Sequence, residues 1–321
     1  MEINKFQEFK EKLQRNIGKV IIGREDKINK IIAAFICGGH VLLEDVPGLG
    51  KTKLAKSLAK SLNLDFKRIQ FTPDILPSDL TGIYFYNQKL GEFQFRQGPI
   101  LSNVLLADEI NRATPRTQSA LLECMEERQI TVEGNTIKLP KPFFVIATEN
   151  PVEQFGTFPL PEAQLDRFFI RISMGYPDYN EEKGIMDRFM LEDPLNSLTE
   201  AVNEAEINYV MENVVKVQIN DEVKNYILDI VRRTRNHEMI ALGASPRASL
   251  SLMKGAQAIA AIQGRDYVIP EDVKTIAVEV LSHRIILKNK SYSSENLSAS
   301  KVVENILNEA NVPLEYIALE K

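Results

Sequence analysis

The sequence contains little cysteine, and the two cysteines it has, Cys37 and Cys124, belong to no CxxC motif or Cys/His cluster. The pattern therefore disfavours a structural zinc site and a disulfide framework, and we expect two buried free thiols. The three histidines, His40, His237 and His283, share no spacing suited to a metal or a catalytic triad. No serine stands in a G-x-S-x-G turn either, so nothing supports nucleophilic catalysis.

Long apolar runs and a strong excess of one charge are also missing. No run reaches the roughly 18 apolar residues of a membrane helix, and the charged start does not resemble a signal peptide. We therefore expect a cytoplasmic protein without membrane insertion. The net charge of −5 argues against a dedicated nucleic-acid binder. A length of 321 residues, 44% of them hydrophobic, is typical of a soluble globular protein with about two domains.

The first half of the chain alternates short apolar runs with helical patterns, after an amphipathic helix that begins near Ile3. The runs predict strands at 41–44, 66–71, 104–107, 143–148 and 168–172. Strands that alternate with helices indicate βαβ units and a mainly parallel sheet covered on both faces. Two further segments read as hairpins, with strands at 83–86 and 93–96 and at 129–132 and 136–139. Gly91 and Gly134 supply the permissive backbone of their loops.

The second half has a different character. Residues 181–308 show helical periodicity and no convincing strand, and Pro246 and Pro270 suit the first position of a helix. We place a domain boundary near residues 175–180. The predicted fold class is α/β, followed by a smaller all-helical part.

A phosphate-binding loop is the strongest chemical signal. The first predicted strand leads into Asp45, Val46, Pro47, Gly48, Leu49, Gly50, Lys51 and Thr52, and a helix is expected from Lys53 onward. The pattern G-x-x-x-x-G-K-[ST] is complete except that Asp45 replaces its first glycine, and aspartate tolerates turn geometry. Lys51 would reach the β- and γ-phosphates and Thr52 would hold Mg²⁺. The alternative is a glycine-rich turn that only caps a helix.

Two later strands end in polar residues suited to the same chemistry. Asp108 and Glu109 close the strand at 104–107, where Asp108 would bind Mg²⁺ and Glu109 would act as general base. Asn150 follows the strand at 143–148 and could orient the attacking water, unless it is an ordinary loop asparagine. Pro151 after it breaks the Asn-Lys-x-Asp guanine motif, which disfavours GTP.

Arginines complete the set. Arg167 directly precedes the last predicted strand, and Arg247 lies in the first turn of a helix, where a positive charge opposes the helix dipole. That unfavourable position suggests an anionic partner. Arg112 and Arg116 are further candidates for contacts with a neighbouring subunit. The alternative is that all four are ordinary surface arginines.

Taken together, these segments resemble the MoxR family of AAA+ ATPases. The resemblance rests on LLEDVPGLGKT (42–52), PSDLTG (77–82), LLADEINRATPRTQSALLECMEE (105–127), ATENP (147–151), PLPEAQLDRF (159–168) and GASPRA (243–248). It implies a five-stranded, mainly parallel αβα P-loop domain over 1–176, a helical lid over 177–321, and a homo-oligomeric ring, commonly a hexamer. ATP would lie between the two domains of one subunit and the flank of the next.

The resemblance also assigns roles to single residues. It implies that Asn150 is sensor 1, that Arg167 is the arginine finger, and that Arg247 is sensor 2, which couples the lid to nucleotide. Ile22 and Gly23 match the segment that packs against adenine. The inserts at about 76–97 and 129–141 would line the pore or meet a client, unless they only extend the fold.

The predicted function is Mg²⁺-dependent ATP hydrolysis that remodels protein complexes in a chaperone-like way. MoxR-like proteins are associated with separate proteins that carry von Willebrand factor A domains, and such an adaptor is an expected partner. The alternatives are a nucleotide-dependent assembly switch, or a motor that acts on nucleic acid, which the acidic balance disfavours. A nucleoside kinase would not explain Arg167 together with Arg247.

Overall fold

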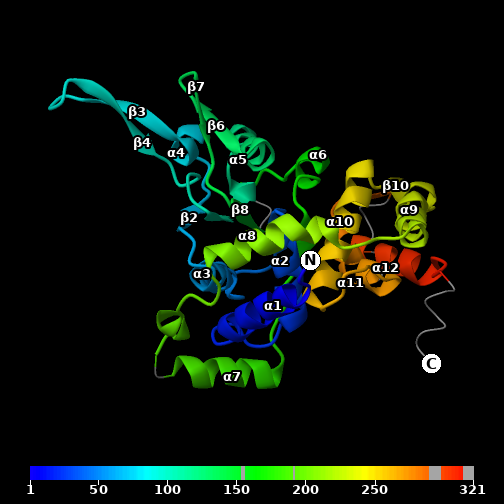
Figure 1. The fold of residues 1–321 in the computed structure, drawn as a ribbon. Coiled ribbons are helices and arrows are strands. Elements are labelled where there is room, and N and C mark those ends of the chain that lie inside the picture. Colours follow the sequence, from blue (N-terminus) through cyan, green and yellow to red (C-terminus); the bar gives the residue numbers. More distant parts are fainter. Residues whose placement is uncertain (153–155, 191, 289–297, 314–321) are drawn as a thin grey trace.

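The computed structural model describes residues 1–321 except 153–155, 191, 289–297 and 314–321. A parallel sheet with helices on both faces forms the centre of the molecule, and a group of helices from the second half packs beside it (Figure 1). Two hairpins project from the sheet on the side away from α7. No helix within the described ranges is long and apolar enough to cross a membrane.

The central sheet has five strands in the order β2-β5-β8-β1-β9, and every neighbouring pair is parallel. The strands are β1 (Val41–Glu44), β2 (Phe66–Gln70), β5 (Val104–Asp108), β8 (Phe144–Glu149) and β9 (Ile170–Ile172). The predicted five-stranded parallel sheet is therefore confirmed, with strand ends that shift by one or two residues.

The residues of the central strands alternate between two hydrophobic clusters. In β1, Val41 and Leu43 face the cluster formed with α1, α2 and α3, whereas Leu42 faces the cluster formed with α5. Burial on both faces explains why these strands appear in the sequence as continuous apolar runs. The helices are α1 (Asn4–Ile17), α2 (Glu25–Ile36), α3 (Lys51–Ser61), α4 (Pro77–Thr81), η1 (Ile110–Arg112), α5 (Pro115–Glu127) and α6 (Glu162–Leu165).

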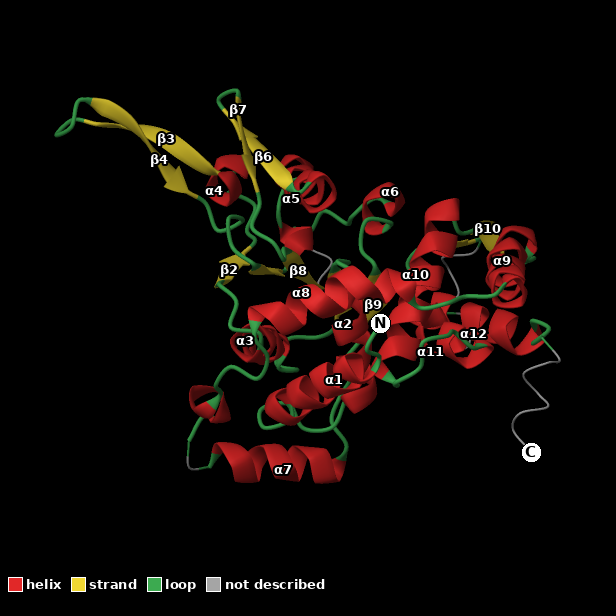
Figure 2. Cartoon of the chain, in the orientation of Figure 1, coloured by secondary structure: helices red, strands yellow, loops and turns green. Residues whose placement is uncertain are grey.

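Both predicted hairpins are present (Figure 2). The first pairs β3 (Gly82–Asn87) with β4 (Glu92–Gln97), and the second pairs β6 (Gln129–Val132) with β7 (Asn135–Lys138). The second turn is one residue shorter than predicted, because Glu133 and Gly134 alone connect the strands, with φ of +48° and +82°. Consecutive positive φ values match the twist of a hairpin.

The second half is helical, with one correction. Its helices are α7 (Tyr179–Phe189), η2 (Pro194–Ser197), α8 (Glu204–Asn213), η3 (Val214–Lys216), α9 (Asp221–Asn236), α10 (Pro246–Ile262), α11 (Pro270–Leu281) and α12 (Ala299–Glu309). The expectation that it holds no strand is wrong, because β10 (Ile240–Leu242) pairs with β11 (Ile286–Leu287). These strands are too short to show a periodicity in the sequence.

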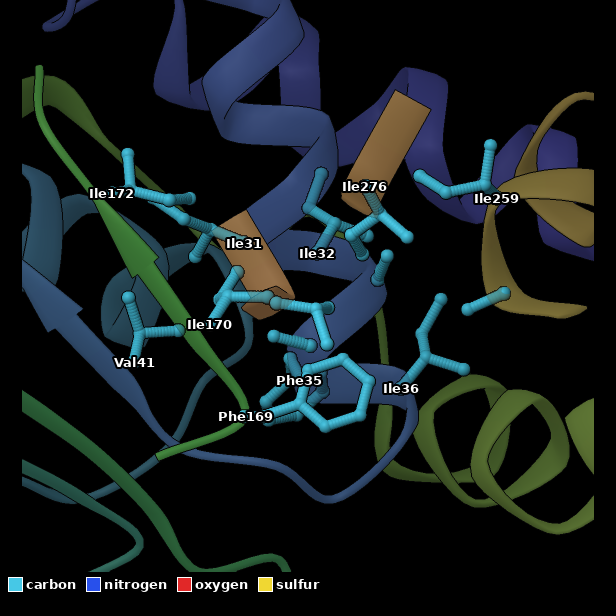
Figure 3. Close-up of a cluster of buried hydrophobic side chains, with 14 of the residues drawn as sticks. Ile31, Ile32, Phe35, Ile36, Val41, Phe169, Ile170, Ile172, Ile259 and Ile276 are labelled. Atoms are coloured by element: carbon cyan, nitrogen blue, oxygen red, sulfur yellow. The ribbon is translucent and has the colours of Figure 1, made fainter. Parts of the chain in front are cut away.

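The helices of the second half share a hydrophobic core with the sheet. In Figure 3, Ile276 of α11 lies beside Ile32 of α2, and Ile259 of α10 and Phe169, which precedes β9, belong to the same buried cluster. An ion pair between Lys30 and Glu279, 2.6 Å long, joins α2 to α11. The α10 and α11 helices therefore dock at the β9 edge of the sheet, while the division at residue 176 stays a prediction.

Both cysteines are free, as expected. Cys124 is buried, whereas Cys37 is only partly buried. The thiol of Cys37 donates to the Lys254 carbonyl at 3.3 Å. Two histidines are also structural, and both are buried. His40 accepts from the Val145 amide at 3.0 Å and faces the Met125 carbonyl at 3.2 Å, and His283 Nε2 lies 3.1 Å from the Phe168 carbonyl. Burial, helped by Arg128, lowers the pKa of His40 to about 3.

Candidate nucleotide-binding site

A cavity of about 800 Å³ opens at the C-terminal ends of β1 and β5. These strands flank β8, so the cavity lies where ligands bind in open α/β sheets. Its size suits a small-molecule ligand. The walls come from three parts of the chain: the segment before α2, the phosphate loop with the ends of β2 and β5, and residues 174–189.

The phosphate loop forms the floor of the cavity. Residues Pro47, Gly48, Leu49, Gly50, Lys51, Thr52 and Lys53 all line it, whereas Val46 does not. Gly50 caps the next helix with a φ of +77°, a conformation that favours glycine. The helix begins at Lys51, two residues earlier than predicted, so its first amides face the loop. Free amides and the positive end of a helix favour an anion here.

Lys51 is held inside the cavity. Its side chain is nearly buried, and its Nζ donates to the Asp45 carbonyl at 2.7 Å. Burial lowers the pKa of Lys51, while the nearby Asp45, Asp108 and Glu109 act in the opposite direction. A partly desolvated ammonium group interacts strongly with a phosphate, since water screens it less.

Asp45, which replaces the first consensus glycine, does not use glycine-like geometry, because its φ is not positive. Its buried carboxylate accepts from the Ser173 hydroxyl at 2.7 Å and from the amides of Met174 and Gly175 at 2.6 and 3.1 Å. The aspartate therefore ties the phosphate loop to the segment that leaves the sheet. Its turn tolerance, on which the sequence prediction relied, is not the reason for its presence.

Asp108 and Glu109 line the cavity opposite the loop, at the end of β5. The hydroxyl of Thr148, on β8, donates to Asp108 Oδ1 at 2.7 Å and accepts from the Glu109 amide at 2.8 Å. Glu109 adopts a φ of +57°, a strained conformation for a residue other than glycine. The Thr148 contact supports this conformation, which turns the Glu109 side chain away from the strand direction.

Residues that the sequence reasoning missed surround the two carboxylates. Arg68 of β2 donates to Asp108 Oδ2 from Nε at 3.1 Å and from Nη2 at 2.6 Å. Gln70 Nε2 donates to Glu109 Oε2 at 2.7 Å, and Arg112 Nε lies 2.9 Å from the same oxygen. Arg112, a candidate for contact with a neighbour, thus pairs within its own chain. Only the strand order, which places β2 beside β5, reveals Arg68 and Gln70.

The donor set fits Mg²⁺. The Thr52 hydroxyl and the Asp108 carboxylate are hard oxygen ligands that line one cavity. Within the described part of the chain, no group of three or more His, Cys, Asp or Glu side chains could hold a metal alone. Magnesium in nucleotide sites commonly uses one or two protein ligands and completes its shell with phosphates and water.

The other end of the cavity is apolar. Ile21 and Ile22 line it from one side, and Ile185, Met186 and Phe189 of α7 line it from the other. Ile22 thus lies where the resemblance predicts an adenine contact. Gly23 does not line the cavity, and a side chain there would collide with Glu181 of α7.

The Arg24 side chain joins the segment before α2 to the segment that contains α7. It donates to both carboxylate oxygens of Glu181 at 3.0 and 2.8 Å, and to the Tyr176 carbonyl at 2.6 Å. The helix that lines the apolar end is α7, and α9 to α11 contribute no lining residue.

Asn150 lies next to the site rather than in the lining. It directly follows β8, it is nearly buried, and its Oδ1 accepts from the Val152 amide at 3.2 Å. The preceding residue, Glu149, lines up with Glu44 of β1 in the sheet. Burial, together with the charge of Glu44, raises the pKa of Glu149 to about 7, while Arg171 opposes this shift.

Arg167 and Arg247 lie away from the cavity but contact the same carboxylate. Arg167 Nε is 3.1 Å from one Glu126 oxygen, and Arg247 Nη2 is 2.6 Å from the other. Both line a second, smaller cavity of about 170 Å³ that also contains Glu126. Neither arginine lines the phosphate-loop cavity. The placement therefore does not support the expectation that Arg247 contacts the nucleotide of its own subunit. Arg116 is exposed on α5.

Asp166, the residue before Arg167, is bonded to residues of the second half of the chain. It accepts from Arg284 Nε at 2.6 Å and from the Ser245 hydroxyl at 3.2 Å. Arg284 is nearly buried and also donates to the Phe168 carbonyl at 2.6 Å. The arginine pair is thus held where the second half docks on the β9 edge.

Comparison with known proteins gives consistent matches. Residues 40–170 match the family model of the ATPase family associated with various cellular activities (AAA), and residues 232–306 match the AAA lid domain. The chain is 38% identical to the chaperone MoxR1 of Mycobacterium tuberculosis, over 92% of this chain and 80% of that protein. It is 48% identical to the uncharacterised protein YeaC of Bacillus subtilis, over 96% of both.

A solved structure has the same fold. The structure of a putative ATPase from Cytophaga hutchinsonii has a TM-score of 0.89 and 42% sequence identity, and the match covers 97% of each chain.

Proposed function

This chain belongs to the MoxR family of AAA+ ATPases, and on that premise we propose that it hydrolyses ATP in a homo-oligomeric ring. One observation carries the proposal: a single cavity is lined both by the phosphate loop from Pro47 to Lys53 and by Asp108 with Glu109. A loop that only capped a helix would not need two carboxylates facing it. The apolar end, between Ile22 and α7, has the character that an adenine ring requires.

Each group has a distinct task. The loop amides and Lys51 bind the β- and γ-phosphates, and Thr52 with Asp108 holds Mg²⁺. The metal, when bound, neutralises charge that develops on the phosphate oxygens. Glu109 accepts a proton from the attacking water, and Gln70 and Arg112 orient its carboxylate. Asn150, at the end of the intervening strand, positions that water as sensor 1.

We place Arg167 and Arg247 in the active site of the neighbouring subunit. They converge on one carboxylate, Glu126, and lie outside the cavity of their own chain. Two guanidinium groups that share one anion suit a second anion, such as a γ-phosphate. An arginine finger is worth about 10³–10⁵ in rate in related systems. A ring, for which we propose six subunits, supplies the neighbour.

For the biological role we propose chaperone-like remodelling of a protein client. A relative named as a chaperone supports this role. The β3–β4 hairpin adds a surface for it, because Tyr86 and Phe93 pack against each other while 54% and 70% exposed. A separate von Willebrand factor A domain protein belongs to the proposal as an adaptor. An assembly switch and a nucleic-acid motor are the alternatives.

The activity is tested by measuring ATP turnover per subunit over a wide range of protein concentration with Mg²⁺ present. We expect turnover to rise as subunits assemble. Constant turnover down to concentrations where sizing shows monomer would contradict the shared site. Absence of hydrolysis at every concentration would contradict the ATPase activity itself.

The remodelling role needs a separate readout. We expect the wild type with ATP to suppress aggregation of heat-denatured citrate synthase, and Tyr86→Ser/Phe93→Ser to lose this effect while keeping its ATPase. Glu109→Gln that protects as well as the wild type would favour the assembly switch instead. Binding to single-stranded DNA that stimulates hydrolysis would favour the nucleic-acid motor.

A further inference from the structure

Both oxygens of the Asp108 carboxylate are occupied. Oδ1 accepts from the Thr148 hydroxyl at 2.7 Å, and Oδ2 accepts two N–H groups of Arg68 at 3.1 and 2.6 Å. The Asp108 side chain is 12% exposed, and Arg68 reaches it from the open side with 46% of its side chain exposed. A guanidinium group therefore covers the oxygen that a metal ion, or its bound water, would need.

The strand register brings Arg68 to this place. Gln70, not Arg68, lies opposite Asp108 in the β2–β5 pair, so the Arg68 side chain extends along the strand direction to reach the carboxylate. Arg68 Nη2 also donates to Gln70 Oε1 at 2.8 Å, and Gln70 donates on to Glu109. Arg68 thus contacts the proposed metal ligand directly and the proposed base through one amide.

Charge explains why such a residue is useful. Asp108 and Glu109 are consecutive carboxylates beside a cavity, and without a cation they repel each other. Lys51 acts on both carboxylates through its charge, but its Nζ donates its hydrogen bond to the Asp45 carbonyl. Arg68 supplies a positive charge at the point where the site will later receive Mg²⁺.

We infer that Arg68 is a positioning residue that substitutes for the divalent cation at Asp108 before nucleotide binds and must be displaced when Mg²⁺ binds with nucleotide. This inference rests on the proposed function, since it takes Asp108 as a metal ligand. Displacement also breaks the Arg68–Gln70 contact, so metal binding changes the surroundings of Glu109. Arg68 therefore makes the site respond to metal and nucleotide together.

The test measures Mg²⁺ binding without using turnover. A fluorescent ADP analogue is bound at a fixed concentration below saturation, and Mg²⁺ is titrated with wild type and with Arg68→Gln. ADP is chosen because it lacks the γ-phosphate, which Arg68 could contact after displacement. We expect Arg68→Gln to lower the Mg²⁺ concentration at half-saturation by about two- to fivefold, the range for exposed ion pairs. Arg68→Lys, which keeps the charge, should remain closer to wild type.

Two controls isolate the effect. Arg171→Gln removes an arginine–carboxylate pair (to Glu44, 3.3 Å) from the opposite edge of the same sheet and should leave the Mg²⁺ midpoint unchanged. In an Asp108→Asn background, Arg68→Gln should have no further effect. Binding of the analogue in EDTA should be equal in wild type and Arg68→Gln, because Arg68 competes with the metal and not with the nucleotide.

Thermal unfolding gives a second readout. Arg68→Gln should melt at a lower temperature than wild type without ligand, and saturating Mg²⁺ with ADP should close the gap. An unchanged or higher Mg²⁺ midpoint in Arg68→Gln overturns the inference, as does an equal loss of affinity with Mg²⁺ and with EDTA. If wild type binds the analogue equally well with and without Mg²⁺, Asp108 is not a metal ligand, and the inference is overturned. Failure to bind ADP at all contradicts the proposed function first.

Discussion

The carboxylate of Asp45 accepts a hydrogen bond from the backbone amide of Met174 at 2.6 Å. This contact joins the two sides of the nucleotide cavity, because Asp45 begins the phosphate loop and Met174 begins the segment that leads to α7. Residues of α7 form the apolar wall. Asp45 therefore helps to hold the apolar wall in place relative to the phosphate loop, together with the Arg24–Glu181 pair.

We expect Asp45→Ala to weaken both folding and nucleotide binding. It leaves the buried Met174 amide without its acceptor, which costs about 2–3 kcal/mol of unfolding free energy for a bond to a charged group. The KM for ATP should rise several-fold, with a smaller change in kcat, because the walls move but the catalytic groups remain. Urea denaturation and steady-state kinetics measure the two effects.

Two variants control this prediction. Asp45→Asn keeps an acceptor and should be intermediate. Asn203→Ala removes the N-cap of α8, a side chain whose Oδ1 accepts from the Glu206 amide at 3.0 Å. Asn203 does not line the cavity. The substitution should lower stability by about 1 kcal/mol without changing the KM. An Asp45→Ala protein with wild-type KM would show that the contact serves folding alone.

Substitutions of Lys51 and Glu109 should affect different steps, nucleotide binding in the first case and hydrolysis in the second. Lys51→Ala removes the cation that faces the phosphates and should abolish ATP binding, as measured by calorimetry. Glu109→Gln keeps the shape of the base but removes its proton-accepting charge, so ATP should bind normally while turnover falls about 10²-fold or more. Persistent hydrolysis in Glu109→Gln would remove Glu109 from its role, and unchanged affinity in Lys51→Ala would remove the phosphate-loop assignment.

The arginine pair predicts complementation between subunits. Arg167→Ala and Arg247→Ala should each bind ATP normally yet hydrolyse it poorly. Mixing Arg167→Ala with Lys51→Ala should restore activity, because the second subunit cannot bind ATP but supplies an intact Arg167 to the first. A mixture that stays inactive, although sizing shows mixed rings, would mean that Arg167 acts within its own chain.

Stability should depend on pH through Glu149. The carboxyl has a pKa raised from 4.5 to about 7 by burial and by Glu44. Below about pH 4.5 it is protonated in both the folded and the unfolded state. Between about 4.5 and 7 only the unfolded state ionises, so the free energy of unfolding falls as pH rises, by up to about 1.4 kcal/mol per pH unit. Above about 7 this contribution is constant.

Glu149→Gln should remove this contribution, so its stability relative to wild type should increase from pH 5 to pH 8 in urea denaturation. Glu92→Gln, which removes the same charge from an exposed position on β4, is the matched control and should show no such trend. A parallel stability profile for wild type and Glu149→Gln would show that Glu149 does not bind the extra proton.

Local sequence patterns are sufficient to predict the candidate phosphate-binding chemistry and most of the helices and strands. The phosphate loop, the Asp108–Glu109 pair and the sheet strands are encoded within short segments, since apolar runs specify buried strands wherever they lie. Contiguous motifs also predict roles for Arg167 and Arg247. The strands β10 and β11 were not predicted, because two or three residues are too few to show a periodic pattern of apolar side chains.

Contacts between side chains that lie far apart in the chain depend on the three-dimensional fold. Arg68 contacts Asp108 because β2 lies beside β5, and Arg167 meets Arg247 at Glu126 because the second half docks on the β9 edge. Neither relationship follows from spacing along the chain, since strand order and helix docking are set by burial of apolar surface over the whole fold. The same packing gave Asp45 its partners, which no local preference of aspartate could predict.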